Sequence, residues 1–80
     1  MERNDILNEL TQIWRRELDD DNVTLQPETT AKDVDGWDSL TNIQLIVATE
    51  KKFKVRFGAS EIMNFQNVGD LADAVKSKLS

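Results

Sequence analysis

The chain has 80 residues, which leaves room for a single domain spanning residues 1–80 with one thin hydrophobic core. It contains no cysteine and no histidine, which excludes disulfides, thiolate zinc sites, cysteine nucleophiles and the most common general base of enzymes. The net charge of −5 argues against nucleic acids and anionic membrane surfaces as partners. No apolar run reaches the length of a membrane span and the N-terminus is polar, so we expect a cytoplasmic protein that does not insert into membranes.

The charge is distributed unevenly along the chain. Residues 1–38 hold eleven acids and four bases, a net charge of −7, whereas residues 39–80 hold four acids and six bases, a net charge of +2. The sign therefore changes between Asp38 and Ser39. A basic cluster follows the next apolar segment: Lys51, Lys52, Lys54 and Arg56.

The first predicted element is an amphipathic helix over residues 3–18, and a long connection follows it. Ile6, Leu10 and Ile13 recur at helical spacing, and the acids of residues 19–21 oppose a helix dipole and should end the helix. Residues 19–38 then hold the only proline. A connection of this length is unusual in a small domain, so we expect an ordered, functional loop. Four apolar residues could attach it to the core: Val23, Leu25, Val34 and Trp37.

Two further main helices and one short helix complete the predicted fold. A second helix begins at Asp38-Ser39, with Asp38 as its N-cap, and runs to about Phe53; it is apolar on more than one face. Residues 60–64 predict a single short helical turn, and Asn67 begins a last helix over residues 68–79. No segment predicts a strand convincingly. The predicted fold class is all-α: a small bundle of three main helices plus one short helix, with a long ordered loop between the first two helices.

Few residues of this chain suggest catalysis or metal binding. Asp33, Asp35 and Asp38 lie close together in sequence, but their spacing differs from that of an EF-hand loop, so no metal site is predicted. Ser39 is the more informative residue, because it lies at the start of the apolar second helix with its hydroxyl facing solvent. No base accompanies it, so we predict neither a catalytic nucleophile nor an enzyme.

The segment around Ser39 resembles the centre of acyl carrier proteins. Residues 35–53 read DGWDSLTNIQLIVATEKKF. In that family an Asp-Ser-Leu triplet opens the second helix, and an aliphatic run ends in Glu and Phe. The flanking segments match as well, including a last helix that opens with NVGDL at residues 67–71. The resemblance covers nearly the whole chain.

This resemblance implies a function for Ser39. Its hydroxyl would carry 4′-phosphopantetheine, donated by coenzyme A through a phosphopantetheinyl transferase, and the thiol of the arm would hold an acyl group as a thioester. The cofactor would thus supply the thiol that the chain lacks. Asp38 and Leu40 would help the transferase recognise the site. Leu40, Ile43 and Val47 would form a stripe for partner enzymes such as an acyl ligase, acyltransferase or ketosynthase, with the carrier acting as a monomer.

Other apolar residues are candidates for the core and for any space that shelters an acyl chain. Plain packing is the more common role for each of them. They are Leu45, Ile46, Phe53, Phe57, Ile62, Phe65, Leu71 and Val75.

The second helix departs from the pattern of carriers in fatty-acid synthesis, where this helix is rich in acids. Here Glu50 is its only acid, beside Lys51 and Lys52, and its polar positions hold Thr41, Asn42 and Gln44. We therefore expect a carrier for a dedicated pathway, such as one making a specialised lipid, polysaccharide or polyketide-type product. Two alternatives stay open: a peptidyl or aminoacyl carrier serving an adenylating ligase, and a helical protein–protein adaptor whose Ser39 is never modified.

Overall fold

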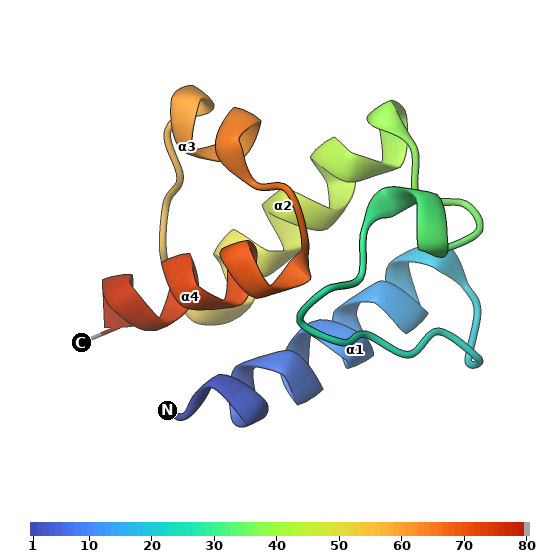
Figure 1. Ribbon diagram of the computed structural model, residues 1–80, viewed down its shortest axis with the longest axis horizontal. Coiled ribbons are helices and arrows are strands. Elements are labelled where there is room, and N and C mark those ends of the chain that lie inside the picture. Colours follow the sequence, from blue (N-terminus) through green and yellow to red (C-terminus); the bar gives the residue numbers. More distant parts are fainter. Residues whose placement is uncertain (80) are drawn as a thin grey trace.

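A computed structural model describes residues 1–79 as a bundle of four α-helices (Figure 1). Within that range there is no strand, and the predicted all-α fold is confirmed. The short 3₁₀ turn η1 in the long loop was not predicted from the sequence. The elements are α1 (Arg3–Leu18), η1 (Ala31–Asp33), α2 (Ser39–Phe53), α3 (Ala59–Asn64) and α4 (Val68–Leu79).

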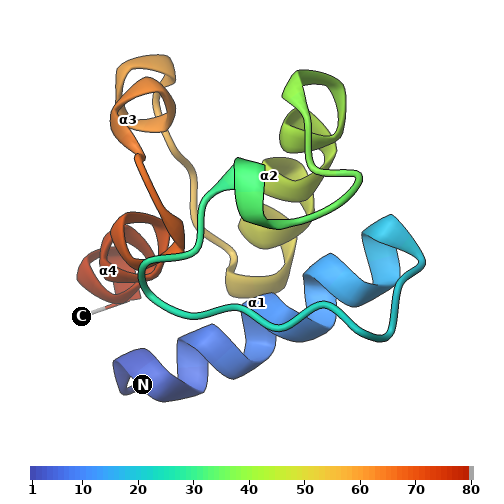
Figure 2. The same cartoon turned by 45° about the vertical axis from the view of Figure 1, so that its right-hand side comes forward.

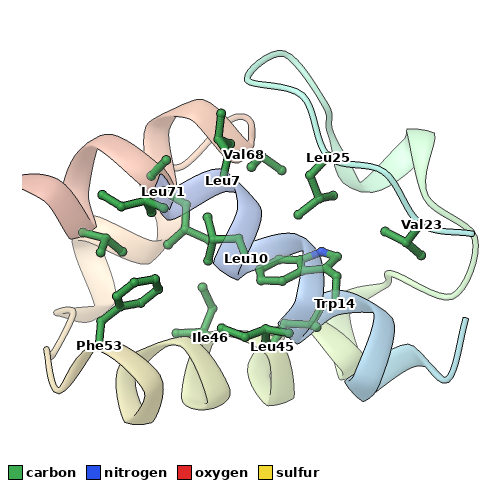
Figure 3. Packing of buried hydrophobic residues seen from close by; sticks show 14 of the residues in the cluster. Leu7, Leu10, Trp14, Val23, Leu25, Leu45, Ile46, Phe53, Val68 and Leu71 are labelled. Atoms are coloured by element: carbon green, nitrogen blue, oxygen red, sulfur yellow. The ribbon is translucent and has the colours of Figure 1, made fainter. Parts of the chain in front are cut away.

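The helix α1 organises the bundle, because it packs against both α2 and α4. Its buried stripe includes Leu10 and Trp14, whose side chains point into a cluster shared with Leu45 of α2 and Leu71 of α4 (Figure 3). The helix ends at Leu18, and its C-cap, Asp19, adopts the left-handed conformation with φ of 53°. Within residues 1–79, sixteen buried apolar residues form one continuous core. None of the helices in this range combines the length and the hydropathy needed to cross a membrane.

The long loop between α1 and α2 is part of the core rather than a free linker. Val23, Leu25 and Val34 are buried, as the sequence predicts, and Trp37 is half-buried against the core. The Arg15 guanidinium, on the last turns of α1, donates from Nε to the carbonyl oxygen of Val23 at 2.8 Å. Figure 2 shows the loop crossing α1 and reaching the start of α4 before it turns back to α2.

The start of α4 holds the middle of this loop. The N–H groups of Val68 and Gly69 donate to the carbonyl oxygens of Thr29 and Pro27, at 2.9 and 2.7 Å. A Cβ at position 69 would lie 2.8 Å from that Pro27 oxygen, so the close approach requires glycine. The loop therefore reaches α2 from a fixed direction.

The predicted core residues divide into two groups. Six are buried, while Ile62 and Phe65, which the sequence groups with the core, are only half-buried and border a pocket described below. Leu79, the last residue of α4, is exposed. The buried six are Leu45, Ile46, Phe53, Phe57, Leu71 and Val75.

Candidate functional site

The candidate site lies where the long loop meets α2. Asp38 is the N-cap of α2, as predicted, and its Oδ1 accepts hydrogen bonds from the N–H groups of Leu40 and Thr41, both at 3.0 Å. The same N–H groups, that of Thr41 foremost, hold the pKa of the exposed Asp38 carboxyl below its ordinary value. Ser39 follows as the first residue of the helix.

Thr41 fixes the turn that precedes Ser39. Its Oγ1 accepts a hydrogen bond from the N–H of Asp38 at 2.8 Å and donates to the carbonyl oxygen of Gly36 at 2.7 Å. Gly36 has a φ of 86°, a conformation that side chains disfavour. Because these bonds close the turn on both sides of Asp38, the backbone at Ser39 is held without any contribution from the Ser39 side chain.

The Ser39 hydroxyl is therefore available for chemistry. Ser39 is exposed, and within residues 1–79 its side chain makes no hydrogen bond. The N-terminus of α2 supplies partial positive charge, which favours a phosphate group attached there. Asp38 is engaged as a cap with a lowered pKa, so it is a poor base for removing the proton from Ser39. The arrangement suits a hydroxyl that another enzyme modifies.

A pocket of about 280 Å³ opens beside Ser39, between the loop, α2, α3 and the start of α4. Its apolar wall brings together residues that are far apart in sequence. Its polar lining consists of Asp38, Ser39, Asn42, Gln66 and Asn67. The pocket is the right size and polarity for part of a small organic group. The apolar wall consists of Trp37, Ile46, Ile62, Phe65 and Leu71.

Trp37 joins this pocket to the core. Its ring stands edge-on against that of the buried Trp14, with ring centroids 5.2 Å apart. Its Nε1 donates to Oδ1 of Asn42 at 2.9 Å, which satisfies the indole N–H at the edge of the pocket. Asn42 is thus a structural partner of Trp37 rather than a free polar residue of α2.

The other polar positions of α2 are engaged as well. Gln44 donates from Nε2 to Oε1 of Glu17 on α1 at 3.0 Å. The carboxylate of Glu50 accepts the N–H of Phe57 at 2.8 Å. These contacts were not predicted from the sequence, because each partner lies on another segment of the chain.

The apolar residues predicted for partner recognition lie on the outside of α2. Leu40, Ile43 and Val47 keep 81%, 66% and 40% of their surface exposed, and their spacing places them along one face of the helix. Met63, which is 83% exposed on α3, was not predicted as part of the exposed apolar surface. The sequence did offer one signal for the exposure of Met63, which is its position next to Ile62 in a short helix. Ile62 faces inward, so the residue that follows it points in a different direction.

One acid of the long loop, Asp33, closes a turn of the backbone. Asp33 accepts hydrogen bonds from the N–H and the hydroxyl of Thr30, at 2.9 and 3.1 Å, and thereby closes the η1 turn. In the part of the chain that the structure describes, no three acidic, cysteine or histidine side chains meet in a group that could hold a metal ion.

Comparisons with known proteins agree on one family. A family model described as a phosphopantetheine attachment site matches residues 8–75, a range that includes the whole of α2. An acyl carrier protein from Acidothermus cellulolyticus is 32% identical over 75 residues, which cover 94% of this chain and 89% of that protein. The solution NMR structure of a holo acyl carrier protein from Geobacter metallireducens matches with a TM-score of 0.87 and 47% identity, over 92% of this chain and 85% of that one.

Proposed function

We propose that Ser39 is the residue to which the phosphopantetheine arm is attached, because this chain belongs to the family of phosphopantetheine-bearing acyl carrier proteins. The family has a covalent phosphopantetheine cofactor, and its members are carriers rather than enzymes. The observation that supports Ser39 is its free, exposed hydroxyl at the N-terminus of α2, on a turn held by Asp38 and Thr41.

The attachment would use coenzyme A and a phosphopantetheinyl transferase. A phosphoester bond forms between Oγ of Ser39 and the pantetheine phosphate, the phosphoanhydride bond of coenzyme A breaks, and adenosine bisphosphate leaves. The transferase must supply the base, because Asp38 is engaged as the cap of α2. Once attached, the arm supplies the thiol that holds an acyl group as a thioester.

The pocket beside Ser39 would shelter part of the acyl chain. It begins at the attachment residue and is walled by Ile46, Ile62, Phe65 and Leu71. Burying apolar atoms there contributes about 25 cal/mol per Å² of surface removed from water. A chain attached through the arm would therefore exchange between this pocket and the active site of an enzyme.

Acyl carrier proteins interact with a phosphopantetheinyl transferase and with enzymes that handle acyl groups. We assign the exposed stripe of Leu40, Ile43 and Val47, with Asp38 at its start, to recognition by those enzymes, among them an acyl ligase, acyltransferase or ketosynthase. The shortage of acids on α2 favours a dedicated pathway over general fatty-acid synthesis. In this proposal residues 1–80 form one carrier domain that acts as a cytoplasmic monomer.

The test is to incubate the chain with coenzyme A and a broad-specificity transferase and to record its intact mass. The natural chain is expected to gain the mass of one arm, and Ser39→Ala is expected to gain nothing. Ser60→Ala is the matched control, because Ser60 is also exposed and also lies in the first turn of a helix, α3. If the natural chain gained no mass, it would be an unmodified adaptor. If Ser39→Ala still gained the arm, the assignment of Ser39 would be wrong.

A further inference from the structure

We propose that the C-terminal end of α2 docks against a carboxylate-rich surface of the partner enzymes, through Lys51, Lys54 and Arg56. This inference rests on the proposed function, since the partners are the enzymes that meet the arm on Ser39. It concerns a different part of the surface, at the far end of α2 from the attachment residue.

These three cations are exposed, and no carboxylate among the described residues pairs with them. The structure contains five ion pairs within residues 1–79, and none of them includes Lys51, Lys54 or Arg56. By contrast, their neighbour Lys52 lies 3.3 Å from the carboxylate of Glu9 on α1. In a chain of net charge −5 with fifteen acids, three neighbouring cations of this kind form a local surface of the opposite sign.

The nearby acids are engaged with the protein itself. Glu50, the only acid of α2, accepts the N–H of Phe57 and thereby holds the segment after the helix. Glu17 accepts the amide of Gln44 and pairs with Arg16 at 3.4 Å. Neither carboxylate forms an ion pair with the three cations, so the positive charge of Lys51, Lys54 and Arg56 remains available to a partner.

The shape of the surface also favours contact at this place. Two shallow hollows lie on either side of Val47 and Lys51, and both of these residues line each hollow. Lys54 and Arg56 line one hollow, together with Glu50. Val47 is also the last residue of the exposed stripe of α2, so the apolar and the cationic surfaces are continuous.

The distance between the three cations and Ser39 determines where a partner enzyme must present its carboxylates. Lys51 follows Ser39 by twelve residues, which at 1.5 Å per residue separates them by about 18 Å along the helix axis. A partner that receives the arm at one end of α2 would therefore present its carboxylates about 18 Å from the entrance of its active site.

A protein surface fits this face better than an anionic membrane does. The exposed acids Asp35 and Asp38 lie at the other end of the same helix. A bilayer of anionic lipids would attract the cations but repel those acids, because it presents one sign of charge to both ends. A protein can present carboxylates at one end and cations at the other, which satisfies both.

The experiment uses one ketosynthase in two versions: its natural form with a basic docking surface, and a form with three of those basic residues changed to Glu. Each carrier is loaded with the same acyl group, its mass is checked, and kcat/KM is measured at low salt. The natural chain is expected to favour the Glu-bearing enzyme by about tenfold. Lys51→Glu should reduce this preference, and Lys51→Glu with Lys54→Glu should reverse it, with both effects shrinking as salt rises.

Lys76→Glu is the matched control for Lys51→Glu, since both change the charge by the same amount but Lys76 lies on α4 beside Glu2. It should leave the preference within about twofold. Equal effects of the two substitutions, or no preference by the natural chain, would overturn the proposal while leaving Ser39 assigned. Binding of the natural chain to phosphatidylserine vesicles that is lost in Lys51→Glu would also overturn it in favour of a membrane. Failure to attach the arm at all would overturn both proposals.

Discussion

The two faces of α2 carry similar side chains in opposite environments. On the inner face, Leu45 and Ile46 are 0% and 6% exposed and belong to the buried core, whereas on the outer face Leu40 and Ile43 remain largely in water. The inner residues gain the free energy of burial when the chain folds, and the outer ones gain it only when a partner covers them. One helix thus separates the residues that hold the fold from those that serve its function.

The largest expected effect comes from truncating the inner face. Leu45→Ala should lower the free energy of unfolding by about 2–5 kcal/mol, and Leu71→Ala on α4 should do the same, because each leaves a cavity in a closely packed core. Urea denaturation followed by circular dichroism measures both. In a domain this small such a loss approaches the total stability. A loss below about 0.5 kcal/mol for Leu45→Ala would show that the faces of α2 have been assigned wrongly.

A smaller effect is expected at the border between the two faces. Asn42→Ala removes the acceptor of the Trp37 indole N–H and should cost about 1 kcal/mol, with a change in tryptophan fluorescence. Gln44→Ala is the control, since it removes an exposed hydrogen bond to Glu17 and should change stability by less than about 0.5 kcal/mol. Equal losses of stability in Asn42→Ala and Gln44→Ala would mean that the Trp37–Asn42 hydrogen bond stabilises the fold no more than an exposed one does.

The start of α2 should show a dependence on pH. The N–H groups of Thr41 and Leu40 lower the pKa of Asp38 from its ordinary value of 3.8. A carboxyl with a lower pKa in the folded chain stabilises the fold above that ordinary value, and the contribution is lost as the pH falls through the folded pKa. We expect Asp38→Asn, which keeps an acceptor at the cap, to lose melting temperature less steeply below pH 3.8 than the natural chain.

The matched variant for this measurement is Asp21→Asn, whose carboxylate is exposed and makes no hydrogen bond within residues 1–79. Its melting temperature should follow the natural chain through the same pH range. If Asp38→Asn also followed the natural chain, the cap of α2 would make no pH-dependent contribution to stability.

The smallest expected change in stability comes from the outer face. Ile43→Ala should alter the free energy of unfolding by less than about 0.5 kcal/mol, because the side chain has few contacts to lose. The same substitution should slow acyl transfer to or from a partner enzyme by several-fold, mainly through KM. A stability loss equal to that of Leu45→Ala would remove the distinction between the two faces.

The sequence predicted the parts of the fold that depend on local periodicity. Helical spacing indicated the bounds of α1, α2 and α4, and the excess of apolar residues in α2 indicated that this helix has a second apolar face. The cap at Asp38 followed from residue type alone. Each of these features depends on residues within a few positions of one another.

Contacts between distant segments could not be predicted in this way. Gln44 bonds to Glu17, 27 positions earlier, and Gly69 is required by the carbonyl of Pro27 on a different element. Ile62 and Phe65 are typical core residues by type, but they are half-buried because they wall a pocket that only the tertiary arrangement creates.

The position of the arm is the central claim, and peptide mapping tests it. Trypsin cleaves after Lys32 and Lys51, and the peptide of residues 33–51 contains a single serine, Ser39. After reaction with coenzyme A and a transferase, tandem mass spectrometry is expected to find the added mass on this peptide, with fragments placing it on Ser39. An arm on Thr41, or on the peptide of residues 57–76 that contains Ser60, would contradict the assignment.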